Sequence, residues 1–167
     1  MKISTSRFGT IELDSSRVVE MKGPILGFEH LRKFALIQHD NQSPFWWLQS
    51  AEDGAVAFVV VDPFMVRSDY EPAIGDEDIR LLEIGAPADV LVLAIVTIRK
   101  EPFAATVNLR APLIVHAAKR IAKQIVLEND AYPVQYALAG ESSRAGVRMA
   151  HGSHRPDESR KAAASGK

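Results

Sequence analysis

The sequence contains no cysteine among its 167 residues. This absence excludes disulfide bonds, thiolate zinc sites and a cysteine nucleophile, so the stability has to come from packing. Long apolar segments are lacking too. The longest, Val90 to Ile98, is interrupted by Thr97, and it is far shorter than the roughly 20 residues that span a bilayer. Residues 1–14 alternate polar and apolar side chains, unlike a secretory signal. A cytoplasmic protein that does not enter the membrane is therefore expected.

The chain has little net charge, but its charges are unevenly distributed. The total is −1 at pH 7. Residues 140–167 contain six basic and three acidic side chains, a net charge of +3, which leaves −4 on residues 1–139. An acidic domain has no surplus of cations to bind a phosphate backbone, so no direct contact with nucleic acid is expected of it.

The domain organisation follows from composition. Hydrophobic residues make up 47% and charged residues 25% of the chain, which is typical of a globular protein, and the length suits one core. From Gly140 onward the chain is rich in Gly, Ser, Ala and Arg, with no apolar period. Such a segment buries too little surface to offset its ordering entropy. We predict one domain over residues 1–139 and a disordered basic tail over residues 140–167.

Short segments rich in β-branched and aromatic residues alternate with turn sequences along the domain, at the spacing of antiparallel connections. The fold class predicted is mainly β, a small antiparallel β-barrel-like single domain with one or two short helices. The helices are expected at residues 27–34 and 75–84, the second with Asp76 as its N-cap. The predicted strands cover residue 3 with residues 8–13, then residues 17–21, 34–38, 45–49, 56–61, 91–99, 105–109, 113–116, 124–127 and 134–138.

Motifs of enzyme chemistry are missing from the domain. No Gly-x-Ser-x-Gly elbow, P-loop or Gly-x-Gly-x-x-Gly sequence occurs, and His30, His39 and His116 have no partner motif. The acidic residues between Asp69 and Asp78 do not have the spacing of an EF-hand. We expect no catalytic residues, no cofactor and no metal site. Trp46 and Trp47 should point to opposite faces of a strand, so one packs inside and the other is a candidate for partner contact.

Several strings in the sequence, in the same order and spacing, resemble the FliW family of bacterial flagellar assembly factors. Together they cover roughly residues 3 to 138. The strings are Thr5-Ser6-Arg7-Phe8-Gly9-Thr10-Ile11-Glu12, Gly23-Pro24-Ile25-Leu26-Gly27-Phe28-Glu29, Pro44-Phe45-Trp46-Trp47-Leu48-Gln49-Ser50, Ala57 to Phe64, Asp69-Tyr70, Thr106 to Val115, and Gln124 to Pro133.

The resemblance implies a non-catalytic, β-barrel-like protein that binds newly made flagellin in the cytoplasm. It also implies a second partner, the translational regulator CsrA, which proteins of this family antagonise by direct protein binding without binding RNA themselves. The level of free flagellin would thereby control flagellin translation. An acidic domain suits a basic, RNA-binding partner, and a closed barrel without exposed strand edges favours a monomer.

Polar and aromatic residues near turns are the candidates for partner binding, because loops on a rigid barrel are where binding sites usually lie. Each candidate also has a structural alternative. Phe28 would plug the barrel, Asp62 would cap the turn at Pro63, and Asn108 would satisfy backbone groups. The candidate partner-binding residues are Phe28, Phe45, Trp46, Asp62, Tyr70, Asn108 and Tyr132.

Two other functions stay open at this point. Trp46, Trp47 and the basic tail would suit a protein that binds single-stranded RNA directly, by base stacking and electrostatic attraction. His116 with a neighbouring carboxylate would suit a hydrolase or isomerase.

Overall fold

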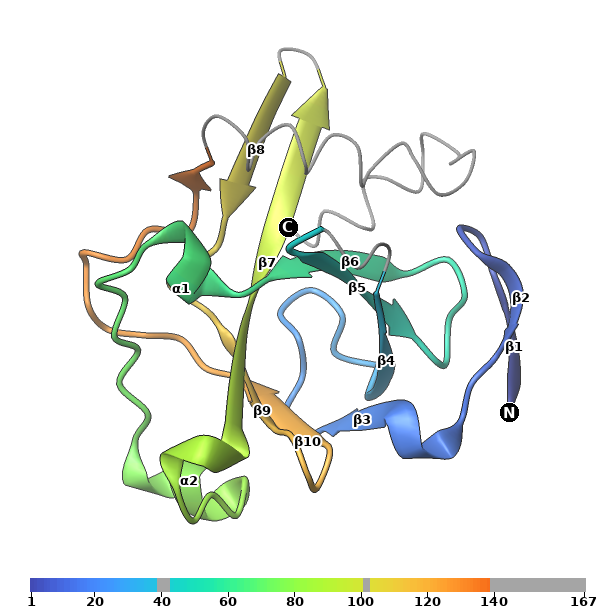
Figure 1. Ribbon diagram of the computed structural model, residues 1–167, viewed down its shortest axis with the longest axis horizontal. Coiled ribbons are helices and arrows are strands. Elements are labelled where there is room, and N and C mark those ends of the chain that lie inside the picture. Colours follow the sequence, from blue (N-terminus) through green and yellow to red (C-terminus); the bar gives the residue numbers. More distant parts are fainter. Residues whose placement is uncertain (39–42, 101–102, 139–167) are drawn as a thin grey trace.

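The computed structural model describes residues 1–38, 43–100 and 103–138 (Figure 1). The predicted tail at residues 140–167 lies outside the described residues. The strands are β1 (Lys2–Thr5), β2 (Gly9–Glu12), β3 (Val18–Met21), β4 (Lys33–Gln38), β5 (Phe45–Ser50), β6 (Ala57–Val61), β7 (Val90–Lys100), β8 (Phe103–Val107), β9 (Leu113–His116), β10 (Ile121–Gln124) and β11 (Tyr136–Ala137). The helices are α1 (Pro63–Val66) and α2 (Asp76–Leu81), with single 3₁₀ turns η1 (Ser15–Arg17) and η2 (Pro87–Asp89).

Seven strands are hydrogen-bonded into a ring. The order β7-β6-β5-β4-β3-β10-β9 is closed by a further pairing of β9 with the first residues of β7. The far half of β7 instead pairs with β8, which carries β11 at its edge. β7, at 11 residues, is long enough to serve both the ring and this extension. The prediction of a barrel-like, mainly β fold with two short helices is confirmed. The pairings are antiparallel except that β10 runs parallel to β3.

The inside of the ring is one hydrophobic cluster to which all seven strands contribute. Strand side chains alternate between two faces, and those of one face meet inside. Examples are Phe34 from β4, Phe58 from β6 and Leu113 from β9. The connection from β3 to β4 folds back between the strands and closes that end of the ring (Figure 1). Its Ile25 and Leu31 are buried in the same cluster.

The other face of β5, β6 and β7 forms a second hydrophobic cluster outside the ring. Trp47, Val59 and Ala94 belong to it. It is covered by the chain from Tyr70 to Leu82 and by the segment that precedes β11, including Leu127 and Tyr132. The two clusters thus lie on opposite faces of the sheet, and the helices pack on the side of the second cluster.

The structure corrects three local predictions. Residues 27–30 form turns rather than a helix, and β4 already begins at Lys33. The backbone of Phe28 bonds to Ile25, and the segment serves as the plug of the ring. The N-cap of α2 is Gly75, without a side-chain hydrogen bond, and Asp76 is the first helical residue. The strand predicted at residues 124–127 ends at Gln124, although Ile125 and Leu127 still bond to the backbone of Pro112 and Arg110.

Candidate functional site

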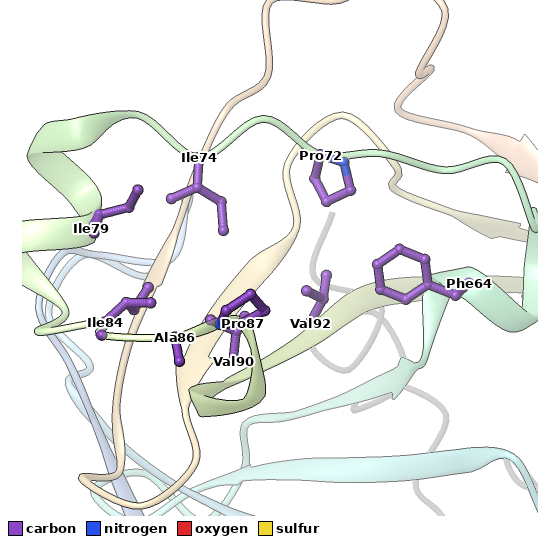
Figure 2. A pocket seen from close by; sticks show the side chains of 10 residues that line it. Phe64, Pro72, Ile74, Ile79, Ile84, Ala86, Pro87, Val90 and Val92 are labelled. Atoms are coloured by element: carbon purple, nitrogen blue, oxygen red, sulfur yellow. The ribbon is translucent and has the colours of Figure 1, made fainter.

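An apolar groove lies between the two helices and the outer face of β7. Its volume is about 520 Å³, which is in the range of protein binding pockets. One side is lined by Ile79, Ile74 and Pro72 (Figure 2). The other side is lined by Ile84, Val90 and Val92, and Phe64 lies at one end. The walls are therefore side chains from α1, α2 and the connections that flank α2.

Acidic residues surround this groove. The chain from residue 62 to residue 90 contains eight Asp or Glu and two Arg, a net charge of −6. Three of these carboxylates are paired with cations: Asp69 with Arg67 at 2.9 Å, Asp78 with Lys123 at 2.6 Å and Glu83 with Lys119 at 2.5 Å. In the described part of the chain, Asp76 and Glu77 form no ion pair. The groove is thus an apolar surface with a strongly negative border.

Helix α1 presents further apolar surface beside the groove. Phe64 is 42% exposed and Met65 is 65% exposed. The carboxylate of Asp62 accepts a hydrogen bond from the Phe64 N–H at 2.9 Å, and Pro63 occupies the first turn, an arrangement that starts a helix firmly. Asp62 therefore caps the helix that presents Phe64. Large exposed apolar side chains next to a groove are typical of a protein-binding surface.

Two buried tyrosines support the groove from behind. The rings of Tyr70 and Tyr132 meet edge to face, with centroids 4.7 Å apart, and the ring of Phe64 contacts that of Tyr70 at a tilt, with centroids 5.7 Å apart. The Tyr70 Oη donates a hydrogen bond to the Leu109 carbonyl at 2.7 Å, and the Tyr132 Oη accepts one from the Glu71 N–H at 2.9 Å. Burial raises the pKa of Tyr70 well above its ordinary value, so it remains a neutral donor.

We expect Tyr70→Phe to lower the free energy of unfolding by about 1–2 kcal/mol, because the buried Leu109 carbonyl loses its donor while the ring packing is kept. Urea denaturation followed by circular dichroism measures this. Tyr132→Phe is the matched comparison and should cost less, because the Glu71 N–H that it leaves belongs to an exposed residue and can bind water. Equal losses for the two variants would contradict the role given to the Tyr70 hydroxyl.

The other candidate residues lie away from the groove. Phe45 is fully buried in the outer cluster, and Phe28 packs edge to face on Phe58 inside the ring, with centroids 5.0 Å apart. Asn108 accepts hydrogen bonds from the backbone N–H groups of Arg110 and Ala111. Trp46 is half-buried at the inner face of β5. The structural alternatives named for Phe28, Asp62 and Asn108 are therefore present, and a direct contact of any candidate with a partner stays a prediction.

The structure places three of the predicted residues, Asp62, Tyr70 and Tyr132, near this groove, but the sequence prediction did not include the residues that line it. Ile74, Ile79 and Ile84 were absent from the prediction, although they recur every five residues within a strongly acidic segment. Apolar residues at regular intervals within an acidic segment were the feature of the sequence that could have indicated the groove. Phe64 was missed because an exposed aromatic cannot be told from a core aromatic in a short apolar run.

His116 has a structural environment. It is buried at the end of β9, and its Nδ1 accepts a hydrogen bond from the Lys119 N–H at 3.2 Å. Its Nε2 faces the Asp89 carboxylate at 3.8 Å. That carboxylate accepts hydrogen bonds from the N–H groups of Gly85 and Ala86, which hold the pKa of Asp89 below its usual value. The histidine thus contacts both Asp89, directly before β7, and the turn between β9 and β10.

Trp46 and Trp47 do point to opposite faces, as predicted. Trp47 is 1% exposed and packs edge to face on Phe8, with the Arg7 guanidinium 4.2 Å from its ring centroid. A stacking platform of two tryptophans is therefore absent from the described part of the chain, because only Trp46 reaches solvent. None of the helices in that part has the length and apolar character needed to cross a bilayer.

A small β ring with a preformed apolar groove and a negative border is the architecture of a binding protein. Comparison with known proteins specifies which one. The family model for the FliW protein matches residues 2–138. The flagellar assembly factor FliW of Syntrophus aciditrophicus is 48% identical over 136 residues, covering 81% of this chain and 86% of that protein. The corresponding protein of Treponema denticola is 36% identical over 146 residues, covering 87% and 99%.

A solved structure agrees with the sequence comparisons. The crystal structure of a flagellar assembly factor FliW superimposes with a TM-score of 0.77 at 34% identity, covering 84% of this chain and 99% of the other. The chain belongs to the FliW family of flagellar assembly factors. The family is non-catalytic, which confirms that the chain is not an enzyme and rules out the hydrolase or isomerase built on His116.

Proposed function

We propose that this protein binds flagellin in the cytoplasm and antagonises the translational regulator CsrA by direct protein binding, so that the level of free flagellin controls flagellin translation. The observation that carries the proposal is membership of a flagellar assembly family combined with the apolar groove in a segment of net charge −6. Apolar walls supply affinity and a negative border attracts a basic partner.

The groove is the surface that we assign to CsrA. An RNA-binding regulator has to be basic to hold a phosphate backbone, and the groove border is the most acidic part of this domain. Negative side chains such as Asp76 and Glu77 repel RNA, so a regulator bound here would meet a surface that competes with its RNA ligand. Flagellin then acts by displacing the regulator, either from the groove or from an adjoining surface.

Isothermal titration of the full chain, and of residues 1–139, against flagellin and CsrA from the same organism tests the proposal. We expect submicromolar binding to each and displacement of one by the other. The CsrA affinity should fall about tenfold or more between 50 and 300 mM salt, because complementary surface charges are screened. Comparison of the two chains measures what the basic tail contributes.

Each result of this titration has a definite meaning. Binding to flagellin alone would reduce the protein to a flagellin chaperone, and binding to neither would contradict the proposal. Titration with single-stranded RNA, which should give no heat, tests the alternative function. Because the ring has no free edge between its seven strands, we also propose a monomer, which light scattering after size exclusion checks.

A further inference from the structure

The ring has a second pocket, at the end opposite the plug. The plug connects the end of β3 to the start of β4, whereas this pocket lies where β3 begins and β4 ends, at Val19, Leu36 and Gln38. Its volume is about 370 Å³. Among the described residues the pocket is therefore the open mouth of the ring, and barrel mouths are frequent sites of ligand binding.

The walls of the mouth belong to the inner face of the ring. Val19 and Val115 are members of the inner cluster, and Leu36 and Trp46 pack against it. Leu91 has the same strand parity as Leu93, so it points inward while its neighbours Val90 and Val92 line the outer groove. The mouth and the groove thus lie on opposite sides of β7 and offer separate surfaces.

Two arginines stand at the rim of this apolar pocket. Arg17 ends the η1 turn before β3, and Arg120 precedes β10 in the turn after β9. Neither forms an ion pair with a carboxylate in the described part of the chain; the Arg120 Nη1 donates only to the Ala118 carbonyl, at 3.4 Å. Arg120 also has a φ of +56°, a conformation that usually selects glycine or asparagine.

We infer that the mouth of the ring binds a carboxylate carried on an aliphatic or aromatic body. The valines, leucines and Trp46 would contact the body, and the guanidinium groups of Arg17 and Arg120 would hold the carboxylate, with which they form paired, charge-assisted hydrogen bonds. Because the other end of the ring is plugged, the ligand enters by one end only and leaves its charged head at the rim. This site goes beyond the proposed function, which uses the outer surface.

Two sources can supply this chemistry: a free small acid, or the C-terminal residue of a protein chain. Octanoate represents the first. An acetylated tetrapeptide ending in Leu-Leu with a free carboxylate represents the second, and the same peptide with a C-terminal amide is its control. Heptylamine and heptanol keep the seven-carbon apolar chain of octanoate and replace its carboxylate by an ammonium or a hydroxyl group; octylamine and octanol, one methylene longer, bracket the effect of chain length.

The test follows the amide and indole N–H resonances of the ¹⁵N-labelled full chain during titration, with the Trp46 signal assigned from Trp46→Phe. A ligand of ten heavy atoms should bind with a Kd of about 1 mM or tighter. We expect octanoate to shift Trp46 and Leu91, and octylamine and octanol to bind at least tenfold more weakly. The free-acid peptide should bind if the source is a chain terminus, and its amide should not.

Variants of the two arginines test whether their side chains bind the carboxylate. Arg17→Gln with Arg120→Asn removes both charges and keeps a residue that tolerates the φ of position 120. We expect at least tenfold weaker octanoate binding, whereas Arg80→Gln, which removes a cation from α2, should leave it unchanged. The inference is overturned if neither the acid nor the peptide shifts Trp46, if octylamine binds as well as octanoate, or if the shifts map to Ile79 and Ile84 instead.

Discussion

Replacing Phe58 by alanine is expected to lower the free energy of unfolding by about 3–5 kcal/mol, a large part of the stability of a domain of this size. Phe58 is 0% exposed and lies at the centre of the ring. Its ring meets Phe28 of the plug at 5.0 Å and Phe34 of β4 at 6.0 Å. Removing it leaves a cavity that a closed ring cannot collapse to fill, because its strands are fixed by hydrogen bonds on both sides.

Urea denaturation of Phe58→Ala, with fluorescence and circular dichroism as probes, measures this loss. Phe103→Ala is the matched control: it makes the same substitution at a residue of β8 that is exposed and lies outside the ring. That variant should lose about 1 kcal/mol or less. If both variants lost the same amount, the inner cluster would not be the main source of stability.

The strands were predictable because each is a local pattern. β5 at residues 45–50 and β9 at residues 113–116 lie within one residue of their predicted limits, since β-branched and aromatic runs bounded by turn residues identify a strand without reference to the rest of the fold. The closure of the ring was not predictable. It depends on β3 pairing with β10 and β7 with β9, and contacts between such distant segments leave no local trace in one sequence.

The plug shows how the fold overrides a local preference. Residues 27–34 follow a Gly-Pro sequence, after which one or two helical turns were predicted. Gly27 instead adopts a φ of +90°, and the turn that results brings Phe28 onto Phe58. Burial of Ile25 and Leu31 inside the ring outweighs the few hydrogen bonds that a short helix would have formed.

The site was harder to predict than the fold, because aromatic residues serve both binding and packing. Phe45, Tyr70 and Tyr132 were selected as aromatic residues near turns, and all three are buried. The half-buried isoleucines of the groove were overlooked, since an isoleucine in sequence is most often part of a core. Only the folded chain shows that Ile79 and Ile84 lie on a surface bordered by carboxylates.

Placing a cation in the groove should have the largest effect on partner binding. Ile79 is half-buried on α2 and lines the groove beside Ile74 (Figure 2). In Ile79→Lys the apolar wall is lost and a positive charge faces the basic partner that we propose. We expect the affinity for CsrA to fall about 30-fold or more, equivalent to about 2 kcal/mol, as for a central residue of an interface. Isothermal titration at a fixed salt concentration measures this.

Leu81→Lys is the control that distinguishes loss of a direct contact in the groove from long-range charge repulsion. It adds the same cation two residues further along α2, at a side chain that is exposed and does not line the groove. Long-range repulsion alone would weaken both variants to a similar extent, and the loss would then disappear at high salt. A loss confined to Ile79→Lys and retained at high salt would instead locate the contact in the groove. Unchanged binding of both variants, with wild-type CsrA affinity confirmed in parallel, would place the regulator on another surface and leave the partner itself established.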